Sequence, residues 1–290
     1  MAQVDATRSP WPDRRRRAAQ LRERHPFAAE VLTLYLALLD VQEPAFAAAA
    51  GAPPGAAAGL ARELLPKVID VTVAAGPVKL AESAVARFHS ADLDDVIGRW
   101  LRGAEQSLVD RYLARAACAP VLEAMDPEGL AVLCPGDPPH EIRTPGYPPR
   151  SEEGGAPRFR GDPGERGAQR CPRCGGPPQL GYLALTDEAL VTGPRHLVCA
   201  RCAATWVHPR LVCAGCGEQT SARLPVYTEA ERFPHARIDA CETCQRYLLG
   251  FDLRRDAEAV PVVDELAALP LDLYARERGL RKVTPNLMGF

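Results

Sequence analysis

The cysteines constrain the fold of this chain more than any other residue type. Eight of the ten lie between positions 171 and 244 and form four C-x-x-C pairs: Cys171/Cys174, Cys199/Cys202, Cys213/Cys216 and Cys241/Cys244. Adding 42 to each cysteine of the first two pairs gives a cysteine of the last two, and Gly175 likewise maps onto Gly217. The segment is therefore an internal duplication, and each copy carries four thiols.

This spacing suits metal binding. Two thiolates on one tight turn can face a single ion, and a second turn completes a tetrahedral cage of four sulfurs that suits zinc or iron. The 24 residues between the inner cysteines of each copy exceed the roughly 15–20 of the usual zinc pattern and leave room for a β-hairpin. The repeat predicts that each copy closes its own site. Site 1 comprises Cys171, Cys174, Cys199 and Cys202, and site 2 comprises Cys213, Cys216, Cys241 and Cys244.

Disulfides are the first alternative, but they need an oxidising compartment. The N-terminus has basic residues at 14–17, yet charged residues and Pro26 interrupt the apolar stretch that follows, and no small-residue cleavage site comes after it. No run reaches the roughly 18 apolar residues of a membrane span. We therefore expect a cytoplasmic protein without a membrane span, whose reduced thiols are available to metal.

The charge balance argues against a nucleic-acid-binding domain, which is expected to be strongly basic. The chain has 35 basic and 37 acidic residues and a formal net charge of −2. Its 290 residues suggest two domains at roughly 100–200 residues each.

Periodicity divides the chain into an all-α half and a ribbon half. Apolar residues recur at steps of three and four before position 134, which predicts five or six helices. Pro44 is expected to interrupt one of these helices and Pro66 to kink or break another, while Ser90 or Asp92 can cap a third. Residues 135–168 are rich in proline, glycine and charge and are predicted to be a linker or surface loop. Residues 169–210 and 211–255 are predicted to be the two metal ribbons, and 256–290 a short helical tail that docks.

The remaining histidines and cysteines receive no catalytic or binding role. Cys118 and Cys134 stand alone, as is typical of small buried hydrophobes. His196, His208 and His235 lie near the C-x-x-C turns, but each copy already supplies four sulfurs. One of these histidines could at most support a ligand from outside the cage.

At this point the residues carry a family resemblance. A helical N-terminal half, CPRCGGPP, a C-x-x-C followed by Trp206, CAGCGE, CETCQRY and the closing LPLDLYARERGLRKVTPNLMGF resemble the formate dehydrogenase accessory protein family, FdhE. The resemblance implies an α+β protein in which a helical domain precedes two tandem rubredoxin-like domains. It also implies that the eight cysteines of sites 1 and 2 are the ligands of two iron ions. Iron rather than zinc follows only from the resemblance, since both metals fit a thiolate cage.

The resemblance further implies a cytoplasmic maturation factor that contacts the catalytic subunit of a respiratory formate dehydrogenase and is not itself an enzyme. One alternative is a zinc-ribbon module that binds nucleic acid or another protein, which salt-dependent affinity for DNA or RNA would reveal. Another is a thiol–disulfide oxidoreductase, which needs an exposed cysteine pair of low pKa. Such a pair normally lies on a thioredoxin-like βαβ pattern, and we find no such pattern in the sequence.

Overall fold

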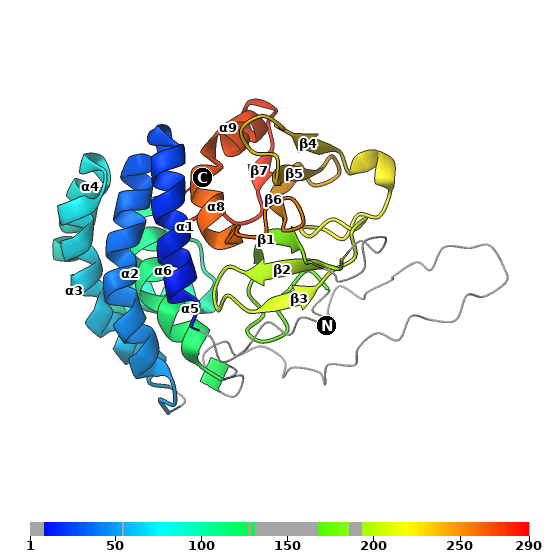
Figure 1. The fold of residues 1–290 in the computed structure, drawn as a ribbon. Coiled ribbons are helices and arrows are strands. Elements are labelled where there is room, and N and C mark those ends of the chain that lie inside the picture. The colour runs from blue at the N-terminus through cyan, green and yellow to red at the C-terminus, as the bar shows by residue number, and fades with distance from the viewer. Residues whose placement is uncertain (1–8, 54, 127–128, 131–167, 186–192, 290) are drawn as a thin grey trace.

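A computed structural model describes residues 9–53, 55–126, 129–130, 168–185 and 193–289. Cys134, His140 and nearly all of the predicted linker lie outside these residues. The described chain is α+β, as predicted: a layer of helices lies beside a twisted sheet (Figure 1). Helix α8 (Pro261–Ala267) lies between the two, and α9 (Leu269–Glu277) lies against the sheet near β4 (Val226–Thr228) and β7 (Arg281–Lys282). The five segment boundaries predicted above remain a prediction about which parts fold independently.

The helical layer contains six α-helices and one 3-10 turn among the described residues. They are α1 (Trp11–Arg24), η1 (Pro26–Ala28), α2 (Ala29–Ala49), α3 (Ala57–Ala75), α4 (Val78–Ser90), α5 (Leu93–Arg102) and α6 (Leu108–Ala124). Asp92 caps α5, because its side chain accepts hydrogen bonds from the backbone N–H groups of Asp94 and Asp95 at 3.0 and 3.2 Å. Gly103 ends the same helix at φ +71°, a conformation that costs glycine little.

The predicted interruption at Pro44 is wrong, and α3 does not break at Pro66. Both prolines lie inside their helices. Each removes one backbone hydrogen bond, but both are exposed to solvent, so water can satisfy the carbonyl that loses its partner. The buried faces of these helices hold them together across the prolines.

The two copies of the repeat supply six strands of one seven-stranded sheet, and the tail supplies the seventh. The strands are β1 (Pro178–Leu183), β2 (Arg195–Cys199), β3 (Thr205–Val207), β4 (Val226–Thr228), β5 (Ala236–Cys241), β6 (Arg246–Asp252) and β7 (Arg281–Lys282). The order is β3-β2-β1-β6-β5-β4, with β7 paired to β6. Each copy contributes three adjacent strands in reverse chain order, and the first strand of the first copy (β1) lies beside the last strand of the second copy (β6).

The strand register repeats the 42-residue offset only in part. His196 faces Val207 in the first copy, and Ile238 faces Leu249 in the second, so both members shift by 42. The first strands differ. Leu197 faces Gly181, but its equivalent Asp239 faces Val226 instead of position 223. A 3-10 turn, η2 (Ser221–Arg223), lies before β4 and displaces it along β5.

Two glycines make the junction between the copies possible. β1 and β6 run parallel there, and Gly181 pairs with Gly250. A Cβ at Gly181 would lie 3.3 Å from Arg195 Nε, and one at Gly250 would lie 3.1 Å from Asp239 Oδ2. The glycines therefore leave room for the Arg195–Asp239 ion pair, which joins the copies at 2.9 Å.

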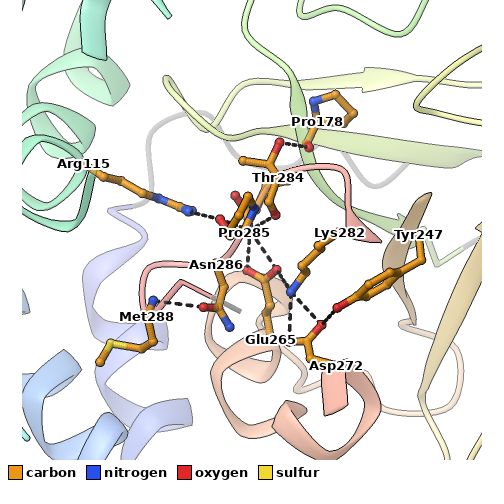
Figure 2. Close-up of polar contacts among 11 residues, drawn as sticks. Arg115, Pro178, Tyr247, Glu265, Asp272, Lys282, Thr284, Pro285, Asn286 and Met288 are labelled. Atoms are coloured by element: carbon orange, nitrogen blue, oxygen red, sulfur yellow. Dashed lines mark hydrogen bonds and ion pairs between the residues drawn. The ribbon is translucent and has the colours of Figure 1, made fainter. Parts of the chain in front are cut away.

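The tail docks, as its apolar sequence predicts. After α8 (Pro261–Ala267) and α9 (Leu269–Glu277), the chain passes between the sheet and the helical layer (Figure 2). Lys282 Nζ lies 2.7 Å from Glu265 and 3.0 Å from Asp272, and all three side chains are buried. Thr284 donates to the carbonyl of Pro178 in β1 at 2.8 Å. Arg115 of α6 donates to the carbonyl of Pro285 at 2.8 Å, so the tail bonds to both layers.

One described helical segment, Pro26–Ala49, is long and apolar enough to cross a bilayer by length and composition, with a mean hydropathy of 1.3. The core helix of a globular protein passes the same test, as does a signal sequence. Leu34 and Leu38 of this segment are fully buried against the other helices. This finding is weak evidence for a membrane span.

Candidate metal centres

Both predicted sets of four cysteines come together, each within its own copy of the repeat. In site 1, Cys171 Sγ lies 3.7 Å from Cys202 Sγ, and Cys174 Sγ lies 3.4 Å from Cys199 Sγ. The four sulfurs of each site all lie within 4.8 Å of one another. A tetrahedral cage with metal–sulfur bonds of about 2.3 Å has edges of about 3.8 Å, whereas a disulfide bond is about 2.05 Å long. The spacing therefore fits a metal cage.

Site 2 has nearly the same dimensions. Cys213 Sγ lies 3.8 Å from Cys244 Sγ, and Cys216 Sγ lies 3.7 Å from Cys241 Sγ. Each copy thus pairs its outer cysteines with one another and its inner cysteines with one another. The two four-cysteine clusters can accommodate two metal ions, and this donor set fits either zinc or iron.

The same backbone turns shape both sites. Cys171 N donates to the carbonyl of Gly176 and Gly175 N to that of Cys171, each at 2.9 Å, and equivalent bonds recur 42 residues later. Gly175 and Gly217 have φ of +66° and +80°, which explains the glycine after each first C-x-x-C. In the second turn of each copy, Ala203 and Gln245 both have φ +54°. Neither residue is glycine, so the sequence does not indicate that the backbone has a positive φ at these two positions.

Electrostatics favour a cation in each cage. Hydrogen bonds from the other three sulfurs lower the pKa of Cys171. In contrast, the other three cysteines and burial raise the pKa of Cys199 well above its usual value. In site 2, burial raises the pKa of Cys213 to about 11. Four thiolates so close together repel one another, so full deprotonation of either set requires a positive ion between the sulfurs.

The sites differ sharply in burial. The four side chains of site 1 are between 1% and 3% exposed. In site 2, Cys213 and Cys241 are 8% and 1% exposed, but Cys216 is exposed and Cys244 half-buried. The repeat does not predict this difference in exposure, because equivalent cysteines occupy the same position within each copy.

Residues next to the sulfurs also differ between the copies. Thr243 donates to Glu218 Oε2 at 2.6 Å and so links the two turns of site 2. We call this hydrogen bond the latch. Together with backbone N–H donors at residues 219 and 220, it lowers the pKa of Glu218 to about 2. The first copy has Gly176 in place of Glu218, and a Cβ at Gly176 would lie 2.8 Å from Cys199 Sγ.

The histidines near the turns have partners other than the cages. The His196 ring stacks on Tyr182 at 5.0 Å, and both ring nitrogens of His208 lie 3.2 Å from carbonyl oxygens. Trp206, which follows a C-x-x-C turn, donates to the carbonyl of Ala168 at 2.9 Å. Cys118 lies in the helical core, where burial raises its pKa to about 12, as expected for a small buried hydrophobe.

A third cluster, His235, Asp256 and Asp264, also has metal-like spacing. A guanidinium already occupies it. Arg17 of α1 bonds to Asp264 through Nε at 3.0 and 3.1 Å and to Asp256 through Nη2 at 2.6 Å, while His235 Nε2 lies 2.9 Å from Asp264. This cluster is an ion-pair network that fastens α1 to the start of α8, and sequence spacing gives no sign of it.

The resemblance stated from the sequence is confirmed by comparison with known proteins. Residues 211–288 match the family model described as FdhE, C-terminal domain. FdhE homologues from Aquifex aeolicus and Pseudomonas aeruginosa are 34% and 36% identical to this chain over 120 and 121 residues. These alignments cover 41% of this chain and 41% and 38% of the two relatives, so the chain matches about two fifths of their length.

The crystal structure of the FdhE protein from Pseudomonas aeruginosa has the same fold. It superposes with a TM-score of 0.60 at 21% identity, over 96% of this chain and 94% of that one. The structural likeness therefore extends through the helical layer, beyond the region that the sequence comparisons match.

Proposed function

We propose that this chain is an FdhE-type accessory protein for the maturation of a formate dehydrogenase. The observation that carries the proposal is the pair of four-sulfur sites, the second of which lies inside the segment that matches the FdhE C-terminal domain. In this proposal the chain acts by binding and not by catalysis. Its partner is the catalytic subunit of the dehydrogenase, which it contacts in the cytoplasm, where thiols stay reduced.

The eight cysteines of sites 1 and 2 are proposed as the ligands of two ions. Iron is favoured by the family resemblance, and zinc fits the same cages. When bound, each ion supplies the positive charge that four crowded thiolates require and cross-links two distant turns. The turns and strands thereby present a pre-organised surface, which reduces the ordering cost of binding a protein partner.

The proposal is tested by capture of the catalytic subunit. Tagged wild-type protein should retain the formate dehydrogenase catalytic subunit in a pull-down and restore formate dehydrogenase activity to a strain that lacks this protein. Cys213→Ser and Cys241→Ser variants should lose at least tenfold in both measurements. Cys118→Ser is the matched control, because this thiol lies outside both cages. A variant without the four cysteines of site 2 that still captured the subunit and restored full activity would contradict the proposal.

The metal is identified by the absorption spectrum of protein purified without air or chelator. A ferric-thiolate spectrum with two irons per chain supports iron. A colourless protein with two zinc ions per chain identifies zinc as the metal and still supports the eight cysteines as its ligands. Salt-dependent binding to DNA in the absence of binding to the dehydrogenase subunit would favour the zinc-ribbon alternative.

A further inference from the structure

We propose that the two cages have different roles: site 1 is a permanent joint between the sheet and the helical layer, and site 2 is an accessible centre whose ion exchanges with small external thiol or nitrogen donors. The inference rests on the proposed metal ligation. It starts from a contrast between equivalent residues. Cys174 is 2% exposed, whereas its counterpart Cys216 (174 + 42) is exposed at the surface. Cys202 is 1% exposed, and its counterpart Cys244 is half-buried.

Site 1 is enclosed because the helical layer packs over it. Its four cysteines belong to the same buried cluster as α3, α5 and α6, which includes Leu64, Trp100 and Leu113. Arg173, between the first two cysteines, donates to the carbonyl of Met125 at the end of α6 at 2.6 Å. An external donor can reach this ion only after the helices separate from the sheet. Release from site 1 therefore requires unfolding of the interface.

Site 2 has no such cover among the described residues. The cluster nearest to it is small and contains Leu197, Ala214 and Leu248 of the sheet region. Val283 of the tail lies nearest to Gly215: a Cβ built on Gly215 would lie 3.3 Å from the Val283 side chain. An incoming thiolate or chelator can thus approach Cys216 from solvent and displace it as a ligand, with the other three sulfurs still in place.

The second copy can lose its ion without losing its fold. A separate buried cluster on the other face of the sheet packs Ile238, Leu249 and Phe251 against Leu271 and Ala275 of α9. This apolar core does not include the site 2 sulfurs. An empty site 2 would therefore loosen the two turns, and the strands would stay paired.

Competition with a chelator tests the division of roles. Full-length protein loaded with two zinc ions is mixed with 4-(2-pyridylazo)resorcinol, and the coloured zinc complex is followed with time. We expect two phases of one equivalent each, with rate constants that differ by at least tenfold. Cys216→Ser should remove the fast phase and leave the slow one. Cys174→Ser, its repeat equivalent, should lower the zinc content or destabilise the whole chain.

A second measurement needs no variant. Iodoacetamide labelling of the zinc-loaded wild-type protein, read by mass spectrometry, should modify Cys216 and Cys244 at least tenfold faster than any cysteine of site 1. Release of both ions in one phase, or labelling of site 1 first, would overturn the inference. Protein that binds no ion at all would instead refute the metal ligation on which the proposed function depends, so the two failures are distinguishable.

Discussion

At the scale of single residues, buried charge decides how the two layers hold together. The Arg17 side chain of α1 is 1% exposed and pairs with Asp264 of α8, which is 2% exposed. A buried ion pair stabilises the fold little compared with an apolar pair, but removal of one partner leaves the other charge buried without a counter-charge. Arg17 is therefore a position at which one substitution should be costly.

We expect Arg17→Ala to lower the free energy of unfolding by about 3–5 kcal/mol, the usual cost of breaking a buried pair. Arg16→Ala is the matched control. Arg16 is its neighbour in α1, is half-exposed and pairs only with Asp13 among the described carboxylates. The control should change stability by less than about 0.5 kcal/mol. Urea unfolding followed by circular dichroism measures both, and equal stability of the two variants would contradict the role given to Arg17.

His25 should make the same interface sensitive to acid. Its ring is buried and stacks on Phe233 of the second copy at 5.2 Å. Burial lowers its pKa, as do Arg24, Arg17 and His235, whereas Asp264 acts in the opposite direction. The unfolded state therefore binds a proton below about pH 6.5 that the folded state resists. Stability should fall as the pH drops from 6.5, until the pH passes the lowered pKa of the folded state.

The measurement compares the free energy of unfolding at pH 7 and pH 5. His25→Phe should reduce the loss between these values by up to about 1.4 kcal/mol for each unit of pKa difference between the two states. His89→Phe, at an exposed histidine of α4, is the control substitution. A wild-type loss identical to that of His25→Phe would show that His25 does not contribute.

At the scale of elements, the two copies show how one pattern acquires two environments. β2 with β3 and β5 with β6 keep the same register. The first strand and the residues around the sulfurs have diverged, and the latch between Glu218 and Thr243 exists only in the second copy. The latch lies on the exposed side of site 2. It therefore fastens the turns at the place where solvent reaches them.

Thr243→Val should speed loss of the ion from site 2 several-fold, because the hydrogen bond that joins the two turns is gone. Thr228→Val, in the exposed edge strand β4, should leave the rate unchanged, since the Thr228 hydroxyl makes no hydrogen bond among the described residues. Stopped-flow release into a chelator measures both rates. An unchanged rate in Thr243→Val would show that the latch does not restrain site 2.

At the scale of the whole molecule, the contacts that join the sheet region to the helices include site 1, the Arg17 network, the His25–Phe233 stack and the tail. Site 1 shares its core with α3, α5 and α6, and Lys282 holds the tail between two buried carboxylates (Figure 2). Damage at site 1 should therefore spread into the helical layer, whereas damage at site 2 should not.

Cys199→Ser and Cys241→Ser form a matched pair, because 199 + 42 gives 241 and both side chains are buried. We expect Cys199→Ser to lower the midpoint of thermal unfolding of the helical signal at 222 nm by several degrees, since about 1 kcal/mol corresponds to roughly 2–4 °C for a chain of this size. Cys241→Ser should lower it less. Equal shifts would show that the helical layer does not depend on site 1 in particular.

The sequence by itself determined what depends on neighbours along the chain. The 42-residue repeat predicted which four cysteines gather in each site, because a C-x-x-C turn and the glycine after it are local structures. The three- and four-residue periodicity predicted the helices, and Ser90 or Asp92 was the predicted cap of a helix, of which the structure selects Asp92 at the start of α5. These patterns depend on residues close together in the chain, so they can be recognised in a single sequence.

Only the tertiary structure decided what depends on distant residues. It joined the two copies in one sheet through Gly181 and Gly250, continued α2 through an exposed Pro44, and placed Arg17 between two carboxylates more than 200 positions away. It also enclosed site 1 and left site 2 open. Two copies of one pattern cannot encode that difference, because burial depends on which other elements pack over a site and not on the spacing of its ligands.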